Sequence, residues 1–126
     1  MSGQQAAVKH EWRIDYVEFA SRDPAASRRF FEAVFGWSFE DYGPDYTAFD
    51  DGGLQGGFFR GEPVTSAAGA PLVVLHATQL SPLQATVLAH GGRLSRSEFT
   101  FPGGRRFQFI EPGGNELAVW SQRDAD

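Results

Sequence analysis

The sequence of 126 residues contains no cysteine, only one lysine, and no apolar run near the length of about 20 residues that spans a membrane. Without cysteine, disulfide scaffolds, thiol nucleophiles and cysteine-ligated metal sites are excluded. Positive charge is also scarce, since 11 Lys and Arg face 16 Asp and Glu, for a net charge of −5. That balance argues against a nucleic-acid partner. Met1–Lys9 is polar and lacks the apolar core of a signal peptide, so we expect a cytoplasmic protein with no membrane partner.

Aromatic and apolar residues are plentiful instead, with 12 Phe and 41% hydrophobic residues against 21% charged ones. These values exclude disorder for the body of the chain, and the length fits one domain. We predict a frayed N-terminus over residues 1–10 and a single domain over 11–122. Within it, modules at 11–60 and 71–122 flank a linker at 61–70 that is rich in Gly, Ala and Pro.

The first module begins with an alternating run, Arg13–Ala20, whose β-branched and aromatic residues predict a strand. Asp23-Pro24 follows and predicts a helix start, because Asp caps free N–H groups and Pro suits the first helical position. The helix is expected over Ala25–Phe35 and ends at Gly36. Further strands are predicted near Trp37–Glu40, Tyr46–Asp50 and Gln55–Arg60.

The second module repeats this order. A strand is predicted over Pro71–Ala77, Ser81-Pro82 is interpreted as a second pair of helix-starting residues, and the helix is expected to run to about His90. Phe99-Thr100-Phe101 leads into a turn, and strands are predicted near Arg93–Arg96, Phe107–Ile110 and Glu116–Ser121. The repeat predicts an α+β fold in which two βαβββ modules form a curved, cup-shaped mixed sheet with helices on the outside. A ligand is expected in the cup.

Several of these segments resemble the vicinal oxygen chelate superfamily, also called the glyoxalase/bleomycin-resistance/dioxygenase superfamily, and within it proteins related to lactoylglutathione lyase. The resemblance covers about residues 13–121 and implies the cup-shaped fold and a homodimer. The residues that carry it are Asp23-Pro24, Arg29-Phe30-Phe31, Val34–Trp37, Tyr46, Gly56-Gly57-Phe58, Gly91–Leu94, Glu111–Asn115 and Leu117–Trp120.

The resemblance also implies four positions for metal ligands, which in metal-dependent members are His, Glu or Gln. In this sequence those positions hold Tyr16, Gly57, Leu72 and Ala118. Because a catalytic divalent metal needs about three protein ligands, we predict neither a metal nor another cofactor. A register shifted by two residues stays open, since it keeps each side chain on its face. That shift would place Glu18, Gln55 and Glu116 together as oxygen donors, with Val74 or Trp120 as the fourth residue.

Three residues are candidates for acid–base chemistry: Glu18, His76 and Tyr16. Glu18 is expected in the cup, where burial would raise its pKa and suit a general base; the alternative is an exposed or Arg-paired Glu. His76 is four residues from Leu72 and therefore points to the same face of the strand. It is expected at the cup rim, either for proton transfer or as a solvated side chain.

The Phe residues of the second module alternate, so they form an aromatic wall in the cup or part of an ordinary core. Phe101 and Trp120 are predicted in the cup. The short basic pairs Arg28-Arg29 and Arg105-Arg106 are interpreted as solvated or paired with acids, and binding of a substrate carboxylate by them is a further alternative.

These observations predict a protein that lacks the family metal ligands and binds an unidentified small amphipathic or aromatic molecule. The alternative is an enzyme, acid–base or metal-dependent, of lyase, isomerase or dioxygenase type acting on a small oxygenated substrate. The predicted ligand-binding residues are Tyr16, Glu18, Gln55, Leu72, Val74, His76, Phe101, Glu116, Ala118 and Trp120.

Overall fold

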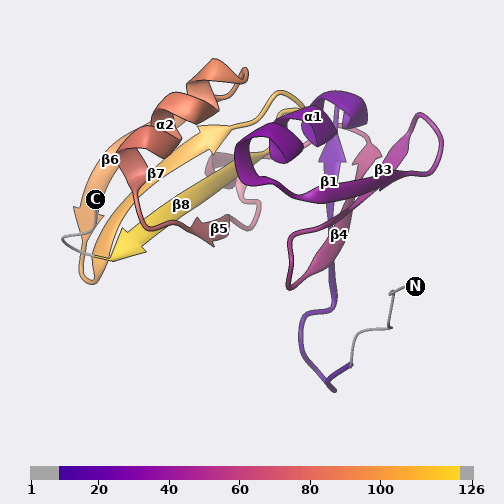
Figure 1. Cartoon of the computed structure of the whole chain (residues 1–126), viewed down its shortest axis with the longest axis horizontal. Helices are drawn as coiled ribbons and strands as arrows, with labels where there is room; N and C mark the ends of the chain where they lie inside the picture. Colours follow the sequence, from indigo (N-terminus) through magenta and orange to yellow (C-terminus); the bar gives the residue numbers. More distant parts are fainter. Residues whose placement is uncertain (1–8, 123–126) are drawn as a thin grey trace.

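The computed structural model describes residues 9–122, so most of the segment predicted to fray, residues 1–10, lies outside the described part. Two βαβββ modules follow each other, as predicted, and the fold class is α+β (Figure 1). Module one contains β1 (Tyr16–Ser21), α1 (Pro24–Phe35), β2 (Ser38–Asp41), β3 (Tyr46–Asp50) and β4 (Gln55–Arg60). Module two contains β5 (Val73–His76), α2 (Leu80–Ala89), β6 (Arg93–Phe101), β7 (Gly104–Ile110) and β8 (Glu116–Gln122); the linker carries a short 3₁₀ helix, η1 (Ser66–Ala68).

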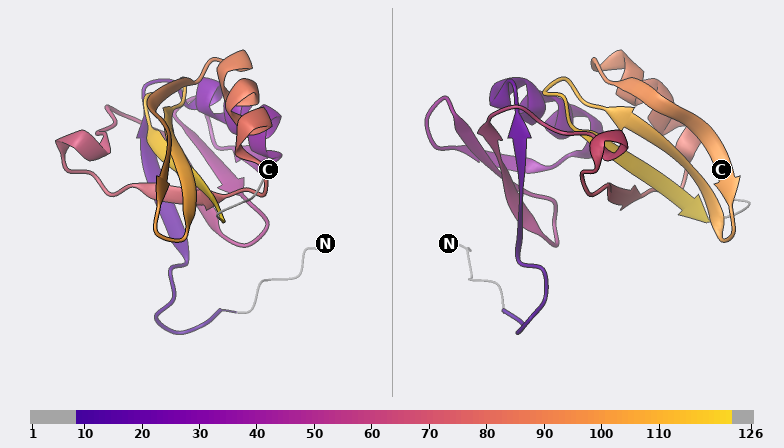
Figure 2. Two further views of the ribbon diagram at one scale, coloured as in Figure 1. Left: turned by 90° about the vertical axis from the view of Figure 1, so that its left-hand side faces the viewer. Right: turned by 180° about the vertical axis from the view of Figure 1, so that it is seen from behind.

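Each module forms a four-stranded mixed sheet, in the order β1-β4-β3-β2 for module one and β5-β8-β7-β6 for module two. The first and last strands of each module are parallel neighbours, and the other pairs are antiparallel. Helix α1 packs on β2, β3 and β4, whereas α2 packs on β6, β7 and β8. The two helices lie next to each other on the same side of the molecule (Figures 1 and 2). We call the sheet surfaces that face away from the helices the bare faces.

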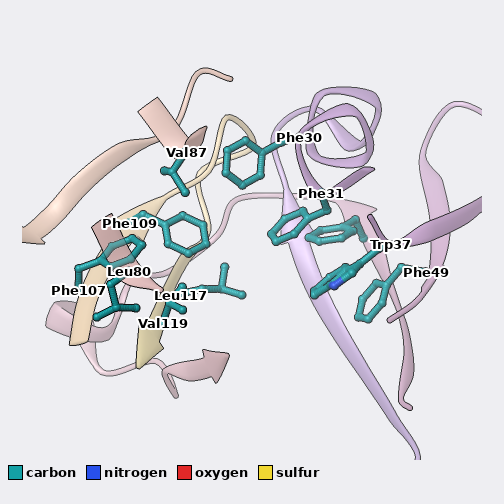
Figure 3. Close-up of a cluster of buried hydrophobic side chains, with 11 residues drawn as sticks. Phe30, Phe31, Trp37, Phe49, Leu80, Val87, Phe107, Phe109, Leu117 and Val119 are labelled. Atoms are coloured by element: carbon teal, nitrogen blue, oxygen red, sulfur yellow. The ribbon is translucent and has the colours of Figure 1, made fainter. Parts of the chain in front are cut away.

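The hydrophobic core lies between the helices and the sheets and is continuous across both modules (Figure 3). Phe31 stacks on Trp37 at 4.6 Å and on Phe58 at 5.3 Å between ring centroids. Phe30 of α1 reaches Phe109 of module two, with ring centroids 5.7 Å apart. Because aromatic side chains bury large areas, this contact joins the two modules by packing as well as by the chain.

The predicted ends of α1 are confirmed. Asp23 accepts a hydrogen bond from the N–H of Ala26, and Gly36 adopts the left-handed conformation with φ of 73°. The prediction of Ser81 as the cap of α2 is wrong, because that helix already begins at Leu80. Leu80 is fully buried in the core, and Pro82 is tolerated within the first turn because N–H groups there have no intrahelical partner.

The segment 93–101 differs from its prediction, since a single strand, β6, replaces a short strand followed by a turn-forming stretch. Its pairing with β7 shifts register twice, between Leu94 and Arg96 and between Arg96 and Phe99. Each shift is a bulge that reverses which face the following side chains occupy. Over residues 9–122, no helix has the length and apolar character needed to cross a membrane.

A buried carboxylate fastens the two modules together. Glu111, which is 1% exposed, accepts hydrogen bonds from the hydroxyl of Ser27, the N–H of Gly113 and the side-chain amide of Asn115. Asn115 also donates to the carbonyl of Ala20 in β1. Burial raises the pKa of Glu111, although these hydrogen bonds lower it in part. The turn between β7 and β8 therefore holds β1 and α1 in place.

Candidate functional site

Three polar side chains form a hydrogen-bonded row on the bare face of module one. The hydroxyl of Tyr46 on β3 donates to Glu18 Oε2 on β1 at 2.9 Å, and it lies 2.6 Å from the hydroxyl of Tyr16. Since the single proton of Tyr46 goes to Glu18, the proton of Tyr16 must point to Tyr46. The hydroxyl oxygen of Tyr16 therefore offers lone pairs to a ligand.

Burial raises the pKa of Tyr46, and its hydrogen bonds with Tyr16 and Glu18 raise it further. Its phenol consequently stays protonated and acts as a donor, not as a base. Tyr46 thus orients the carboxylate of Glu18, whose Oε1 has no protein partner among the described residues. That oxygen is free to accept a hydrogen bond or a proton from a bound molecule.

Gly57 explains how Tyr46 reaches across the sheet. Gly57 lies opposite Glu18 on β4, and a Cβ atom at Gly57 would overlap the phenol of Tyr46. The ring of Tyr46 therefore occupies the space in which a side chain of residue 57 would stand. A tyrosine from the neighbouring strand thus fills the space left free by the glycine.

The bare face of module two is aromatic. Trp120 of β8 lies 5.1 Å from the His76 ring and 6.3 Å from the Phe101 ring, between centroids. His76 Nε2 donates to Oε1 of Gln122 at 2.8 Å, which orients the imidazole at the end of β5. His76, Trp120 and Phe101 thus lie together on one surface of module two.

Glu116 accepts hydrogen bonds from four donors on the same bare face. Oε1 receives the N–H and the hydroxyl of Ser66, and Oε2 receives the hydroxyl of Ser95 and the amide of Gln108. Burial alone would raise the pKa of Glu116, but the hydrogen bonds from Ser95, Ser66 and Gln108 outweigh it and lower the pKa to about 2. Glu116 is therefore ionised at neutral pH and tethers the linker to β8.

A pocket of about 250 Å³ opens where the two sheets meet. Glu18 of β1 and Glu116 of β8 both line it, together with Val73 and the linker residues Pro63 and Val64. Glu62 of the linker lines it too, so apolar side chains and three carboxylates surround one pocket, a lining that suits a small amphipathic molecule. Gln55, the third oxygen donor of the shifted register, lines a different hollow beside Tyr16, of about 530 Å³.

The remaining predicted residues are distributed over module two. Val74 is exposed on β5, and Ala118 lies opposite it on β8 and is fully buried. Leu72 is partly buried and precedes β5. The structure thus brings Glu18 and Glu116 to one pocket, and Trp120, Phe101 and His76 to one aromatic cluster.

Sequence reasoning gave no role to Tyr46, Gln108 or Glu111. Tyr46 was noted only among the residues of the resemblance. Its partners lie 28 and 30 positions earlier in the chain, so no local pattern indicated these contacts. Glu111 belongs to the turn Glu111–Asn115, which was noted for the resemblance. A carboxylate within this Gly-rich turn was the one sequence feature that could have indicated a buried contact between the modules.

The family model described as "Glyoxalase/Bleomycin resistance protein/Dioxygenase superfamily" matches residues 13–119. The chain belongs to this superfamily. No curated protein matches the sequence. A glyoxalase-related enzyme from Fulvimarina pelagi is similar in structure, with a TM-score of 0.72, 23% identity and 88% of each chain covered. A family enzyme from Burkholderia phytofirmans PsJN has a TM-score of 0.73 and 17% identity, over 86% of this chain and 97% of that one.

A third similar structure is a mutant of the fosfomycin resistance protein of Listeria monocytogenes, complexed with Mn(II) and a dihydroxypropylphosphonic acid. Its TM-score is 0.74 and its identity 12%, over 91% of this chain and 94% of that one. At these identities the similarities show the fold. The manganese belongs to that complex, and whether a metal suits the present chain depends on its own donor atoms.

The residues at the four family positions do not fit a divalent metal. Leu72 and Ala118 carry no donor atom, and the space above Gly57 is filled by the Tyr46 phenol. Over residues 9–122, no group of three or more His, Asp or Glu side chains is arranged to hold an ion. Tyr16 alone cannot provide the three ligands that a catalytic site requires.

Proposed function

We propose that this superfamily member binds a small amphipathic or aromatic molecule on its bare faces without a divalent metal. The observation that carries the proposal is the position of Tyr46, whose ring covers Gly57 and whose hydroxyl joins Tyr16 to Glu18. Hydrogen-bonding groups thus stand where metal-dependent relatives are expected to hold an ion. Beside them, the pocket of Glu18 and Glu116 supplies an apolar wall.

The test is a thermal-shift screen of aromatic alcohols, acids and amines in buffer that contains EDTA. At least one compound is expected to raise the melting temperature saturably, since a ligand that binds only the folded state stabilises it. Tyr46→Phe should lower the affinity for that compound about fivefold or more, because the substitution removes the hydroxyl that joins Tyr16 to Glu18. Thr86→Val, which removes a hydroxyl on α2, away from the bare faces, is the control. Compounds that act only after a metal is added would contradict the proposal.

A second candidate is an acid–base enzyme with Glu18 as the base, which its free Oε1 favours. Glu18→Gln distinguishes the two functions. Under the binding proposal the variant keeps its affinity within a fewfold, and no compound is turned over by the wild-type protein. Turnover by the wild-type protein that is lost in Glu18→Gln would establish the enzyme instead.

We also propose that the protein is a homodimer. Phe59 and Val74 are 41–42% exposed on the bare faces, and a second copy would cover such apolar area. Light scattering coupled to size-exclusion chromatography measures the mass directly. Twice the chain mass supports the dimer, and the mass of one chain contradicts it.

A further inference from the structure

The two bulges of β6 bring Arg96 and Phe99 to the same side of the sheet. Residues three apart on a regular strand point to opposite faces. Here Arg96 lies opposite Gln108 and Phe99 lies opposite Arg106, with one extra residue between them on β6. Arg106 and Gln108 alternate with the core residue Phe107, so all four side chains belong to the bare face. Bulges often re-aim side chains at functional sites.

The guanidinium groups of Arg96 and Arg106 both lie near the Phe99 ring. The Cζ atom of Arg96 lies 3.6 Å from the Phe99 ring centroid, and that of Arg106 lies 5.4 Å from it. A ring attracts each cation, but two like charges near one ring also repel each other. An anion bound between them would relieve that repulsion.

Neither Arg96 nor Arg106 forms an ion pair within residues 9–122. Arg22, Arg28, Arg60 and Arg105 are paired with carboxylates, whereas the guanidinium groups of Arg96 and Arg106 lie near the Phe99 ring.

The polar partners of Arg106 leave part of its guanidinium available. Nη2 donates to Gln108 Oε1 at 3.2 Å, and Nε is buried without a hydrogen-bond partner in the described part of the chain. The nearby carboxylate of Glu116 already receives four donors, including Gln108. Because protein atoms enclose Nε, an anion on the bare face would be received by Nη1, which has no hydrogen-bond partner within residues 9–122.

A planar apolar surface adjoins these charges. Arg106 lies opposite Trp120 on β8, and Trp120 packs near Phe101. We infer that the ligand of the proposed function is an aromatic oxyanion, whose carboxylate or phosphoryl group binds Arg96 and Arg106 while its ring packs beside Trp120. The inference rests on the proposed function and adds the chemical class of the ligand. A guanidinium suits this task because its fork matches two oxygens of one anion.

The probes are 2-naphthoate and its neutral analogue 2-naphthylmethanol, titrated calorimetrically into the full chain with EDTA present. Naphthoate is expected to bind at least tenfold more tightly than the alcohol, and its affinity should fall as salt is raised. Arg96→Gln and Arg106→Gln should each lower the affinity for naphthoate about tenfold. The affinity for the alcohol should stay within twofold of the wild-type value. Arg29→Gln, on the exposed side of α1, is the matched control and should change neither affinity.

The outcomes separate this inference from the proposed function. Equal affinity for the two compounds in the wild-type protein would overturn the oxyanion inference and leave metal-free binding standing. Absence of binding by both compounds would contradict both proposals. The comparison of probes uses only wild-type protein, so it decides the inference even where a variant fails to fold. Arg106→Lys keeps the charge without the fork and should recover only part of the naphthoate affinity.

Discussion

Glu116→Gln tests how the structure uses its bare-face carboxylate. The substitution keeps the shape of the side chain but replaces one oxygen by an NH₂ group. If that group stands at Oε1 it faces the N–H of Ser66, and if it stands at Oε2 it faces the amide of Gln108. Either orientation leaves a donor without its acceptor, which costs about 1–3 kcal/mol.

The pKa of Glu116 gives a second measure of how much its carboxylate contributes to the free energy of unfolding. It is lowered from 4.5 to about 2, which corresponds to about 3 kcal/mol before solvent screening and to about 2 kcal/mol for a partly exposed group. Because the folded state holds the proton less tightly than the unfolded state, this stability is present above pH 4.5. It is lost as the pH falls from there to about 2.

Urea unfolding followed by circular dichroism measures the effect. Glu116→Gln should lower the free energy of unfolding by about 2 kcal/mol at pH 7, and the difference from wild type should shrink below pH 4. Glu11→Gln, an exposed control, should change stability by less than about 0.5 kcal/mol. A difference that is absent at pH 7, or that stays constant down to pH 3, would refute the reasoning.

Three further substitutions and one control, Gly53→Ala, test the fold by the same unfolding assay. Gly57→Ala should cost about 1–2 kcal/mol and weaken ligand binding, because its methyl group displaces the Tyr46 phenol; unchanged affinity would contradict the account of the row. Gly36→Ala should cost about 1 kcal/mol because φ is positive there, whereas Gly53→Ala, with no positive φ and no close neighbour, should be nearly neutral. Phe31→Ala should cost about 3–5 kcal/mol, since a fully buried ring is removed; a loss below 1 kcal/mol would show that the core is not packed as described.

The parts of the fold that local chemistry determines were predictable. Asp23-Pro24 and Gly36 marked the ends of α1 because capping depends on neighbouring backbone groups. Alternation in β1 also placed Tyr16 and Glu18 on one face, since successive side chains of a strand point to opposite faces of the sheet. The repeat of both patterns was enough to predict two modules.

Features set by distant contacts could not be predicted in this way. The start of α2 follows the burial of Leu80 in a core built from both modules, which overrides the capping signal of Ser81. The bulges of β6 depend on its pairing with β7, so the common face of Arg96 and Phe99 is invisible in the sequence pattern. Tyr46 likewise meets Glu18 only because β4 lies between their strands.

Metal titration tests the central claim most directly. Zn²⁺, Ni²⁺, Mn²⁺ or Fe²⁺ added to EDTA-treated protein should leave the melting temperature unchanged and should produce no lactoylglutathione lyase activity. A native-state metal site at 100 times its Kd would instead stabilise the protein by about 2.7 kcal/mol. A saturable rise of several degrees that disappears in Glu18→Gln would contradict the account, because it would show that the row of Tyr16, Tyr46 and Glu18 opens to hold an ion.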